Sequence, residues 1–254
     1  MKKDIFRQIA VVVSFLFTIT ANGLANALPL NGQTTGAISD SFQVVFVPAG
    51  YVFSIWGVIY LLLAGFTVYQ ALPSQREKAV LLKIGWLAAL SNLLNGAWIF
   101  FWHYNYFTWT LVIMLGLLAT LIAIFLRLDI GKRKFTTAEK WLVSIPFSVY
   151  LGWITVATIA NATALLKYSG WNGWGIDGQT WTIILLAAGV AISIMMSLSR
   201  RDIGYALVLV WAFIGIGVKW LGVYPAVVVS AFVAVGFVLL FLAISRLRKP
   251  TPTE

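Results

Sequence analysis

The sequence predicts an all-α integral membrane protein that crosses the bilayer eight times. Of its 254 residues, 61% are apolar and 10% are charged, whereas soluble domains are roughly half apolar and a quarter charged. The apolar runs are continuous and long enough for helices of about 20 residues, which cross a hydrocarbon core of roughly 30 Å. Because lipid offers backbone groups no hydrogen-bond partner, such runs are expected to be helical.

The limits of the spans follow from the apolar runs and from the prolines. One span should begin near Pro48 and stop before Pro73, because proline suits an early helical position and does not continue a helix easily. The last should begin around Pro225 and end in a basic tail with Arg248 and Lys249, beyond which residues 251–254 should be frayed. The expected spans are 8–28, 46–70, 82–103, 106–127, 138–165, 180–199, 203–220 and 224–245.

The basic residues predict the orientation of these spans. If the N-terminus lies in the cytoplasm, 16 of the 18 Lys and Arg residues fall on the cytoplasmic side, and only Lys167 and Lys219 fall on the other. Short cytoplasmic loops are enriched in Lys and Arg. The sequence therefore predicts that both termini are cytoplasmic, and the bacterial inner membrane is the default location for such a helical bundle.

The first span has a second interpretation. Lys2 and Lys3, an apolar stretch and the small residues of 25–27 together also resemble a secretory signal with a cleavage site. Cleavage would leave seven spans with the new N-terminus outside and would not change the orientation of the others. We favour an uncleaved first helix.

The charged and metal-binding residue types exclude several functions. The eight acidic residues are expected at the N-terminus, in loops or in the tail, so no span should carry the carboxylate that ion-coupled carriers use. The chain has no cysteine and one histidine, His103 at a helix end, so we expect neither a metal site nor catalytic residues. The net charge of +10 comes from residues beside the spans and therefore does not indicate nucleic-acid binding.

Three spans carry polar and aromatic residues at helical spacing. An amide in hydrocarbon is costly unless it finds a partner, so the asparagines of these spans should face the bundle interior. They could serve only as packing contacts between helices, but three similar stripes favour a shared pocket with aromatic walls and a few polar groups. The stripes consist of Trp56 and Tyr60, of Asn95 and Trp98, and of Trp153, Ala157 and Asn161.

Three stretches within these spans resemble a known family. They are PAGYVFSIWGVIY at 48–60, LNGAWIFF at 94–101 and YLGWITVATIAN at 150–161. In order and spacing they resemble the TspO/MBR family of tryptophan-rich sensory proteins, which is related to the mitochondrial translocator protein. The chain departs from the family's usual pattern at Ala49 and Tyr51, where a second proline and a tryptophan are usual.

The resemblance implies a fold and a set of ligand-binding residues. It covers about residues 5–168, so residues 1–168 are expected to form a TspO-like five-helix bundle. Residues 169–254 are expected to form an appended membrane segment of three helices with a basic tail. The pocket residues that the resemblance implies are Tyr51, Phe53, Trp56, Tyr60, Asn95, Trp98, Trp153, Ala157 and Asn161.

The resemblance also implies the kind of function. Members bind planar, largely apolar molecules such as porphyrins, haem and sterols, and the expected role is that of a sensor, regulator or carrier. No cofactor should be required, although porphyrin or haem would be a ligand. The expected partners are the lipid bilayer, a hydrophobic small molecule and a further copy of the chain. The alternatives are a facilitative small-solute transporter and an enzyme that degrades bound porphyrin by photochemistry.

Overall fold

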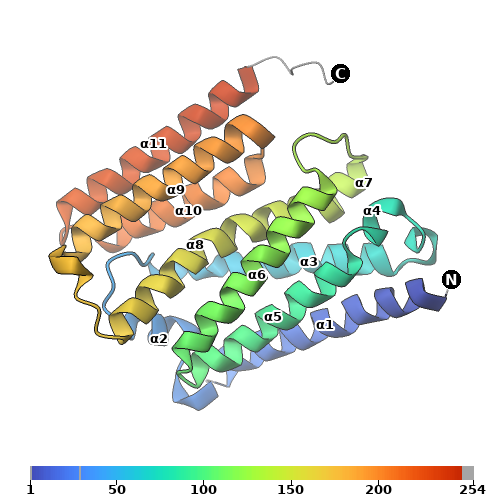
Figure 1. Ribbon diagram of the computed structural model, residues 1–254, viewed down its shortest axis with the longest axis horizontal. Helices are drawn as coiled ribbons and strands as arrows, with labels where there is room; N and C mark the ends of the chain where they lie inside the picture. Colours follow the sequence, from blue (N-terminus) through green and yellow to red (C-terminus); the bar gives the residue numbers. More distant parts are fainter. Residues whose placement is uncertain (1, 29, 248–254) are drawn as a thin grey trace.

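The computed structural model describes residues 2–28 and 30–247. All regular elements within these ranges are helical, and eight long helices lie side by side in a bundle (Figure 1). The long helices are α1 (Lys2–Ala27), α3 (Ile55–Ala71), α5 (Gly85–His103), α6 (Phe107–Leu128), α8 (Ile145–Tyr168), α9 (Gly178–Arg200), α10 (Ile203–Lys219) and α11 (Pro225–Leu247). The short elements are η1 (Leu30–Gly32), α2 (Thr35–Ser41), η2 (Gly50–Ser54), η3 (Pro73–Gln75), α4 (Ala79–Leu82), α7 (Thr137–Glu139), η4 (Lys140–Ser144) and η5 (Gly173–Gly175).

Six of the helical segments are long and apolar enough to cross a membrane. Helix α10 is apolar but has only 17 residues, and α5 is made less apolar by Asn92 and Asn95. The prediction of an α-helical membrane protein is confirmed, whereas the number of eight crossings stays a prediction. The six segments are Asp4–Ala27, Gly50–Ala71, Phe107–Leu128, Thr137–Tyr168, Gly178–Arg200 and Pro225–Leu247.

Two of the expected spans have different limits in the structure. The span expected at 46–70 is helical only from Gly50, because Pro48 has no N–H to donate and disfavours helical backbone at Val47. The span expected at 82–103 is interrupted between α4 and α5. At this break the buried Arg7 of α1 donates a hydrogen bond from Nη1 to the carbonyl oxygen of Leu81 (2.9 Å).

Helix α8 is the centre of the bundle. It packs against α3 and α6, and on another side against α10, which in turn packs against α9 and α11 (Figure 1). Helix α1 packs against α3 and α5. The helical segment that contains α8 begins at Thr137 and passes through the π-helical turn η4 just before Pro146, which cannot donate to the helical ladder. The expected boundary near residue 168 between a five-helix bundle and an appended segment stays a prediction. Helix α10, which follows this boundary, contacts α8, which precedes it.

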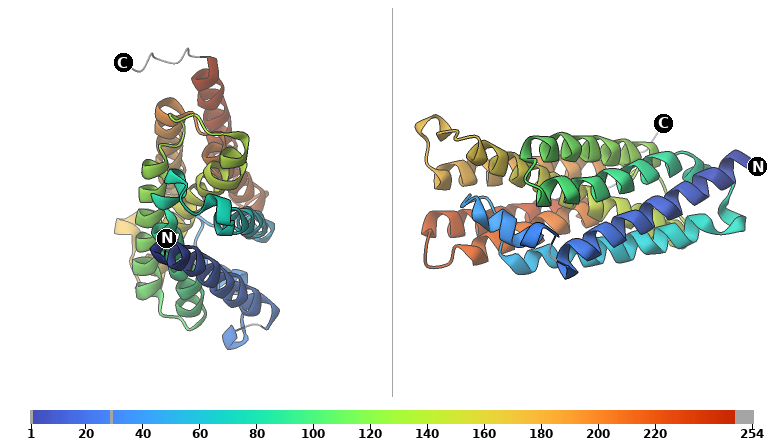
Figure 2. Two further views of the ribbon diagram at one scale, coloured as in Figure 1. Left: turned by 90° about the vertical axis from the view of Figure 1, so that its right-hand side faces the viewer. Right: turned by 90° about the horizontal axis from the view of Figure 1, so that it is seen from below.

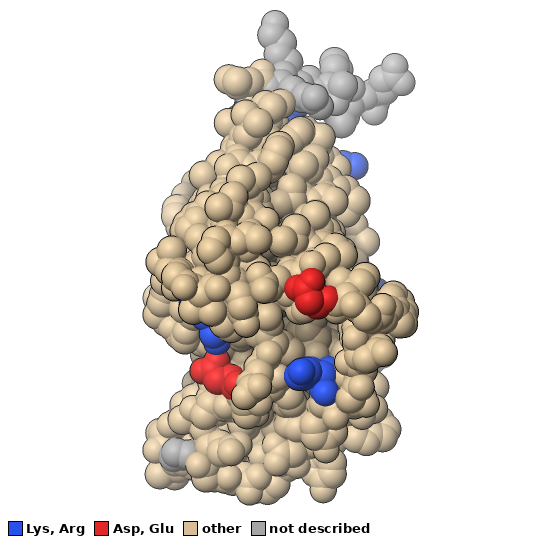
Figure 3. Space-filling model, turned by 90° about the vertical axis from the view of Figure 1, so that its left-hand side faces the viewer, with Lys and Arg blue, Asp and Glu red and all other residues tan. Residues whose placement is uncertain are grey.

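The charged residues differ between the two ends of the bundle. The N-terminus, the end of α11 and the basic loops after α3, α6 and α9 lie at one end (Figures 1 and 2). The opposite end shows few charged side chains (Figure 3); the segments there contribute Asp40, Lys167, Asp177 and Lys219. Arg248, Lys249 and residues 251–254, for which the sequence predicts a basic, frayed tail, lie outside the described residues.

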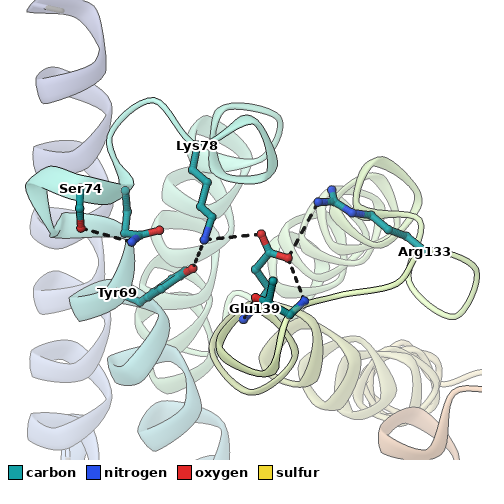
Figure 4. A network of polar contacts seen from close by, with 7 residues as sticks. Tyr69, Ser74, Lys78, Arg133 and Glu139 are labelled. Atoms are coloured by element: carbon teal, nitrogen blue, oxygen red, sulfur yellow. Dashed lines mark hydrogen bonds and ion pairs between the residues drawn. The ribbon is translucent and has the colours of Figure 1, made fainter.

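Glu139 corrects the expectation that no acidic residue lies within a span. It lies in α7, at the start of a helical segment that could cross the membrane, and is 5% exposed. Its carboxylate accepts a hydrogen bond from the backbone N–H of Thr136 and lies 3.7 Å from Lys78 and 3.9 Å from Arg133 (Figure 4). A hydrogen bond with Tyr69 raises the pKa of Lys78. Glu139 thus caps its helix and joins two loops at the basic end.

Candidate functional site

A cavity with aromatic walls lies where η2, α3, α5 and α8 meet. Its volume is about 60 Å³, enough for a few water molecules. Helix α6 and residues 44–48 complete its walls. Of the nine residues that the sequence predicts for the ligand pocket, six line this cavity: Phe53, Trp56, Trp98, Trp153, Ala157 and Asn161.

The aromatic rings of the cavity pack in the edge-to-face and stacked arrangements that such rings prefer. The ring centroids of Trp56 and Trp153 lie 6.0 Å apart with planes at 85°, and Phe53 meets Trp153 at 6.1 Å. Trp98 stacks on Trp102 of the same helix at 5.1 Å. These contacts bring together residues that are about 100 positions apart in the sequence and give the cavity rigid, mostly apolar walls.

Two polar side chains of the cavity differ in their hydrogen bonding. The side-chain oxygen of Asn161 accepts from Trp98 Nε1 (3.0 Å), and its Nδ2 donates to Thr110 Oγ1 (3.0 Å). The Nε1–H of Trp153 is buried and has no acceptor among the described residues. A buried donor without a partner costs on the order of 1–3 kcal/mol, so an acceptor atom on a bound molecule would remove this cost.

Three of the predicted pocket residues lie outside the cavity. Asn95 donates from Nδ2 to Tyr150 OH (2.7 Å), and its Oδ1 accepts from Asn22 Nδ2 (2.9 Å) and from Tyr60 OH (3.4 Å). Asn95 therefore joins neighbouring helices through hydrogen bonds, as expected of a packing contact, and does not line the cavity. Tyr60 stacks behind Trp56 (5.4 Å), and Tyr51 is 46% exposed against Trp211.

Several cavity residues were not among those that the sequence predicts. Ala160 and Ala164 continue the face of Ala157 at helical spacing, so the α8 stripe could have been extended to them. Trp102 likewise lies four residues after Trp98 on α5, so helical spacing could have found it as well. Most of the remainder come from irregular or distant segments, for which periodicity gives no signal. The remainder includes Thr35 and Ser39 of α2, residues Val44, Phe46, Val47 and Pro48, and Met114 and Val156.

The non-helical residues 42–49, here called the covering segment, form one wall of the cavity and are hydrogen-bonded to α10 and its C-cap residue. The backbone N–H of Ala49 donates to the carbonyl oxygen of Gly215 (3.0 Å), and Trp220 Nε1 donates to that of Val45 (2.8 Å). Just beyond the segment, Trp211 Nε1 donates to the carbonyl oxygen of Val52 (3.0 Å). One wall of the cavity is therefore tied to α10, a helix that lies outside residues 1–168.

The single histidine has a structural position at the end of α5. His103 is fully buried, and its Nε2 lies 3.0 Å from Thr35 Oγ1, while its Nδ1 lies 3.0 Å from the carbonyl oxygen of Leu30. Both ring nitrogens are therefore engaged by the segment that precedes the covering segment, and this fixes α2 next to the cavity.

Comparison with known protein families identifies a relationship for most of the chain. The sequence model of the TSPO-like protein family matches residues 8–244, so the match includes α9, α10 and α11 as well as the five-helix part. No curated protein and no solved structure matches the chain. The family match covers nearly the whole chain and agrees with the resemblance carried by residues 48–60, 94–101 and 150–161. The chain is an integral membrane protein that belongs to the family of TSPO-like proteins.

Proposed function

We propose that this protein binds planar, largely apolar molecules of the porphyrin, haem or sterol type in its aromatic cavity. The observation that carries the proposal is Trp153, whose buried N–H lacks an acceptor in the cavity wall. Trp56 and Trp98 supply flat apolar surface, and the polar edge of a ring system could accept from Trp153. The role is that of a sensor, regulator or carrier, and no cofactor is needed for it.

Binding of such a ligand requires the cavity to enlarge. Its volume of about 60 Å³ is well below the roughly 300–1,000 Å³ of typical ligand pockets. The covering segment is the wall that can move at the lowest cost, because it is not helical and is held to α10 by a few hydrogen bonds. We therefore expect the ligand-bound protein to have this segment displaced from the cavity.

The topology is part of the proposal. We infer eight crossings with both termini in the cytoplasm of a bacterium, since the basic loops lie at the end of the bundle that holds the start of α1 and the end of α11. On this view α10 crosses the membrane although it has 17 residues, close to the lower limit of about 17 for a span. Helix α5 keeps its amides inside the bundle, away from lipid.

Titration of the purified full-length protein with protoporphyrin IX tests the proposal. We expect saturable binding, a shift of the porphyrin Soret band and quenching of tryptophan fluorescence. Trp153→Phe should weaken binding about threefold to tenfold, the loss expected for one hydrogen bond. Trp141→Phe is the matched control, because Trp141 is 58% exposed and lies outside the cavity.

A second variant separates loss of the site from loss of the fold. Ala157→Leu adds apolar volume inside the cavity and should weaken binding more than Trp153→Phe, while the helical circular dichroism stays that of the parent. Equal affinity in the parent, Trp153→Phe and Ala157→Leu would show that porphyrin does not bind in this cavity.

A further inference from the structure

A second and larger space lies on the other side of the covering segment. It is a cleft of about 560 Å³ between the second half of α8, the beginning of α9 and the loop that joins them. Val44 and Phe46 contribute to both the cleft and the aromatic cavity, so the covering segment is the partition between them. None of the nine residues that the sequence predicts for the ligand pocket lines this cleft, one wall of which is α9.

The charged group of the cleft lies at one end of it. Lys167, near the end of α8, is the only charged residue in its lining, and its side chain makes no hydrogen bond or ion pair within the described residues. Lys219, the other cation at this end of the molecule, is already paired with Asp40 at 2.6 Å. Asn172 lies beside Lys167 in the lining and uses its side-chain oxygen to accept from Trp174 N. Lys167 therefore offers a positive charge to an anion.

In the deep part of the cleft, the threonine hydroxyls already donate hydrogen bonds within the protein. The hydroxyls of Thr158, Thr163 and Thr182 each donate to a carbonyl oxygen of their own helix, at 2.7, 2.8 and 2.8 Å. The other deep lining residues are apolar, among them Ile159 and Leu185. The cleft thus combines one charged end with an apolar interior, which is the chemistry of an amphiphile.

The dimensions and position of the cleft fit a single acyl chain. Lys167 and Thr158 are nine residues apart on α8, or about 13 Å along the helix, close to half of the roughly 30 Å hydrocarbon core. At the charged end, the rings of Trp171 and Trp181 lie 5.3 Å apart, and tryptophan clusters of this kind mark the level of the lipid headgroups. The apolar interior therefore extends from the headgroup level toward the middle of the bilayer.

We propose that this cleft is a second ligand site, which binds a long-chain carboxylate with its head at Lys167 and its chain between α8 and α9. One cation matches one negative charge. A single chain can place the methylene groups nearest its carboxylate against both walls, whereas a lipid with two chains would leave one chain outside. The occupant is thus a fatty-acid-type anion that enters from the bilayer leaflet on the side of Lys167.

Photolabelling of the full-length protein in nanodiscs of neutral phosphatidylcholine tests this site. The probe is palmitic acid that carries a diazirine in its chain, and mass spectrometry locates the labelled residues. We expect the label to concentrate within residues 158–185 and to be competed by unlabelled palmitate. Lys167→Gln should lower the labelling about fivefold, equivalent to about 1 kcal/mol. The neutral diazirine-bearing hexadecanol should label these residues equally weakly in both proteins.

Two further variants control the experiment. Lys132→Gln removes an exposed cation at the opposite end of the bundle and should leave the labelling unchanged. Ala162→Trp fills the cleft and should lower labelling at least as far as Lys167→Gln; if it does not fold, the comparison of the two lysine variants still decides. Label that lies mainly outside residues 158–185, or that is equal in Lys167→Gln and Lys132→Gln, would overturn the proposal. So would a diazirine-bearing phosphatidylglycerol that labels the cleft more strongly than the fatty acid.

Discussion

The two parts of the bundle on either side of α8 are held together by different chemistry. Helices α1, α3 and α5 meet through side-chain hydrogen bonds, such as Thr18 Oγ1 to the carbonyl oxygen of Asn92 (2.6 Å) and Asn22 Nδ2 to Asn95 Oδ1 (2.9 Å). Helices α9, α10 and α11 meet through small residues, such as Gly189, whose position lets the ring of Phe213 approach closely. In a bilayer both strategies are available, because packing and interhelical hydrogen bonds replace the hydrophobic effect as the force between helices.

The two kinds of contact have different consequences for the cavity. Polar contacts fix the register of α1 and α5 and thus hold the tryptophans of the cavity in place. Close packing lets α10 approach α8 and reach the covering segment with its backbone and its tryptophans. Helix α10 therefore holds one wall of the cavity in place, although none of the described residues of α9, α10 and α11 lines the cavity itself.

The largest effect is expected where the two parts touch. In Gly215→Ala the new Cβ would overlap Val52 Cγ2 and lie 3.1 Å from Pro48 Cβ, so the buried Val52 side chain must shift or α10 and η2 must separate. We expect a loss of about 1–3 kcal/mol in the free energy of unfolding, as for overpacked cores, seen as a lower Tm by tryptophan fluorescence. Gly236→Ala is the control, because nothing lies within 4 Å of its Cβ; equal Tm values for both variants would contradict a tight α10 contact.

A large effect is also expected from the polar contacts of the N-terminal part. Asn95→Leu removes the hydrogen-bond partner of the buried Tyr150 hydroxyl and one of the two acceptors of Asn22 Nδ2. Asn22 Nδ2 keeps its other acceptor, the carbonyl oxygen of Thr18. The substitution should cost about 1–3 kcal/mol. The measurement is the midpoint of thermal unfolding in detergent. Adding Asn22→Leu to Asn95→Leu should recover part of the loss, since removal of both partners leaves fewer polar groups unpaired. A double variant less stable than the sum of both single variants would rule out this account.

An intermediate effect is expected on the covering segment. Trp220→Phe and Trp211→Phe each remove one hydrogen bond to residues 45–52, worth about 0.5–1.5 kcal/mol. Amide hydrogen exchange at residues 43–49 should become faster, and porphyrin should associate faster. Trp141→Phe, on an exposed surface, should change neither rate. Slower exchange in Trp220→Phe would mean that α10 does not restrain the segment.

A smaller effect is expected from the ion pair at the sparsely charged end. Asp40→Asn removes the partner of Lys219, but Asp40 is 62% exposed, so solvent screens the pair. We expect a loss of at most about 0.5 kcal/mol, which should disappear at 1 M salt. The Tm at low and high salt is the measurement, and a loss that does not depend on salt would point to packing instead of charge.

The smallest effect is expected from a polar group within the closely packed C-terminal part. The Oγ of Ser193 in α9 is buried and has no partner among the described residues. Ser193→Ala removes this group, so the Tm should stay within about 1 °C of the parent or rise slightly. A marked decrease would show that this part, too, depends on polar contacts, and would remove the contrast with the N-terminal helices.

Particular residues show how far the sequence alone predicts the structure. Hydropathy and prolines predict the eight helices, but not the loss of helix at residues 46–49, although Pro48 is a signal against helix there. Spacing predicts that Asn95 and Asn161 both face the interior, and both do. It cannot tell that Asn161 lines a cavity while Asn95 is enclosed by other side chains, because Asn22 and Tyr150 are 73 and 55 residues away along the chain.

The sequence by itself determined which face of each helix contacts lipid and which faces the bundle interior. A polar or aromatic stripe at helical spacing must turn away from lipid whatever the fold. Only the tertiary structure decided what each stripe meets there: another amide, a ring or empty space. That outcome depends on how the helices are rotated and how closely they approach, and both are set by contacts between segments that are distant in the chain.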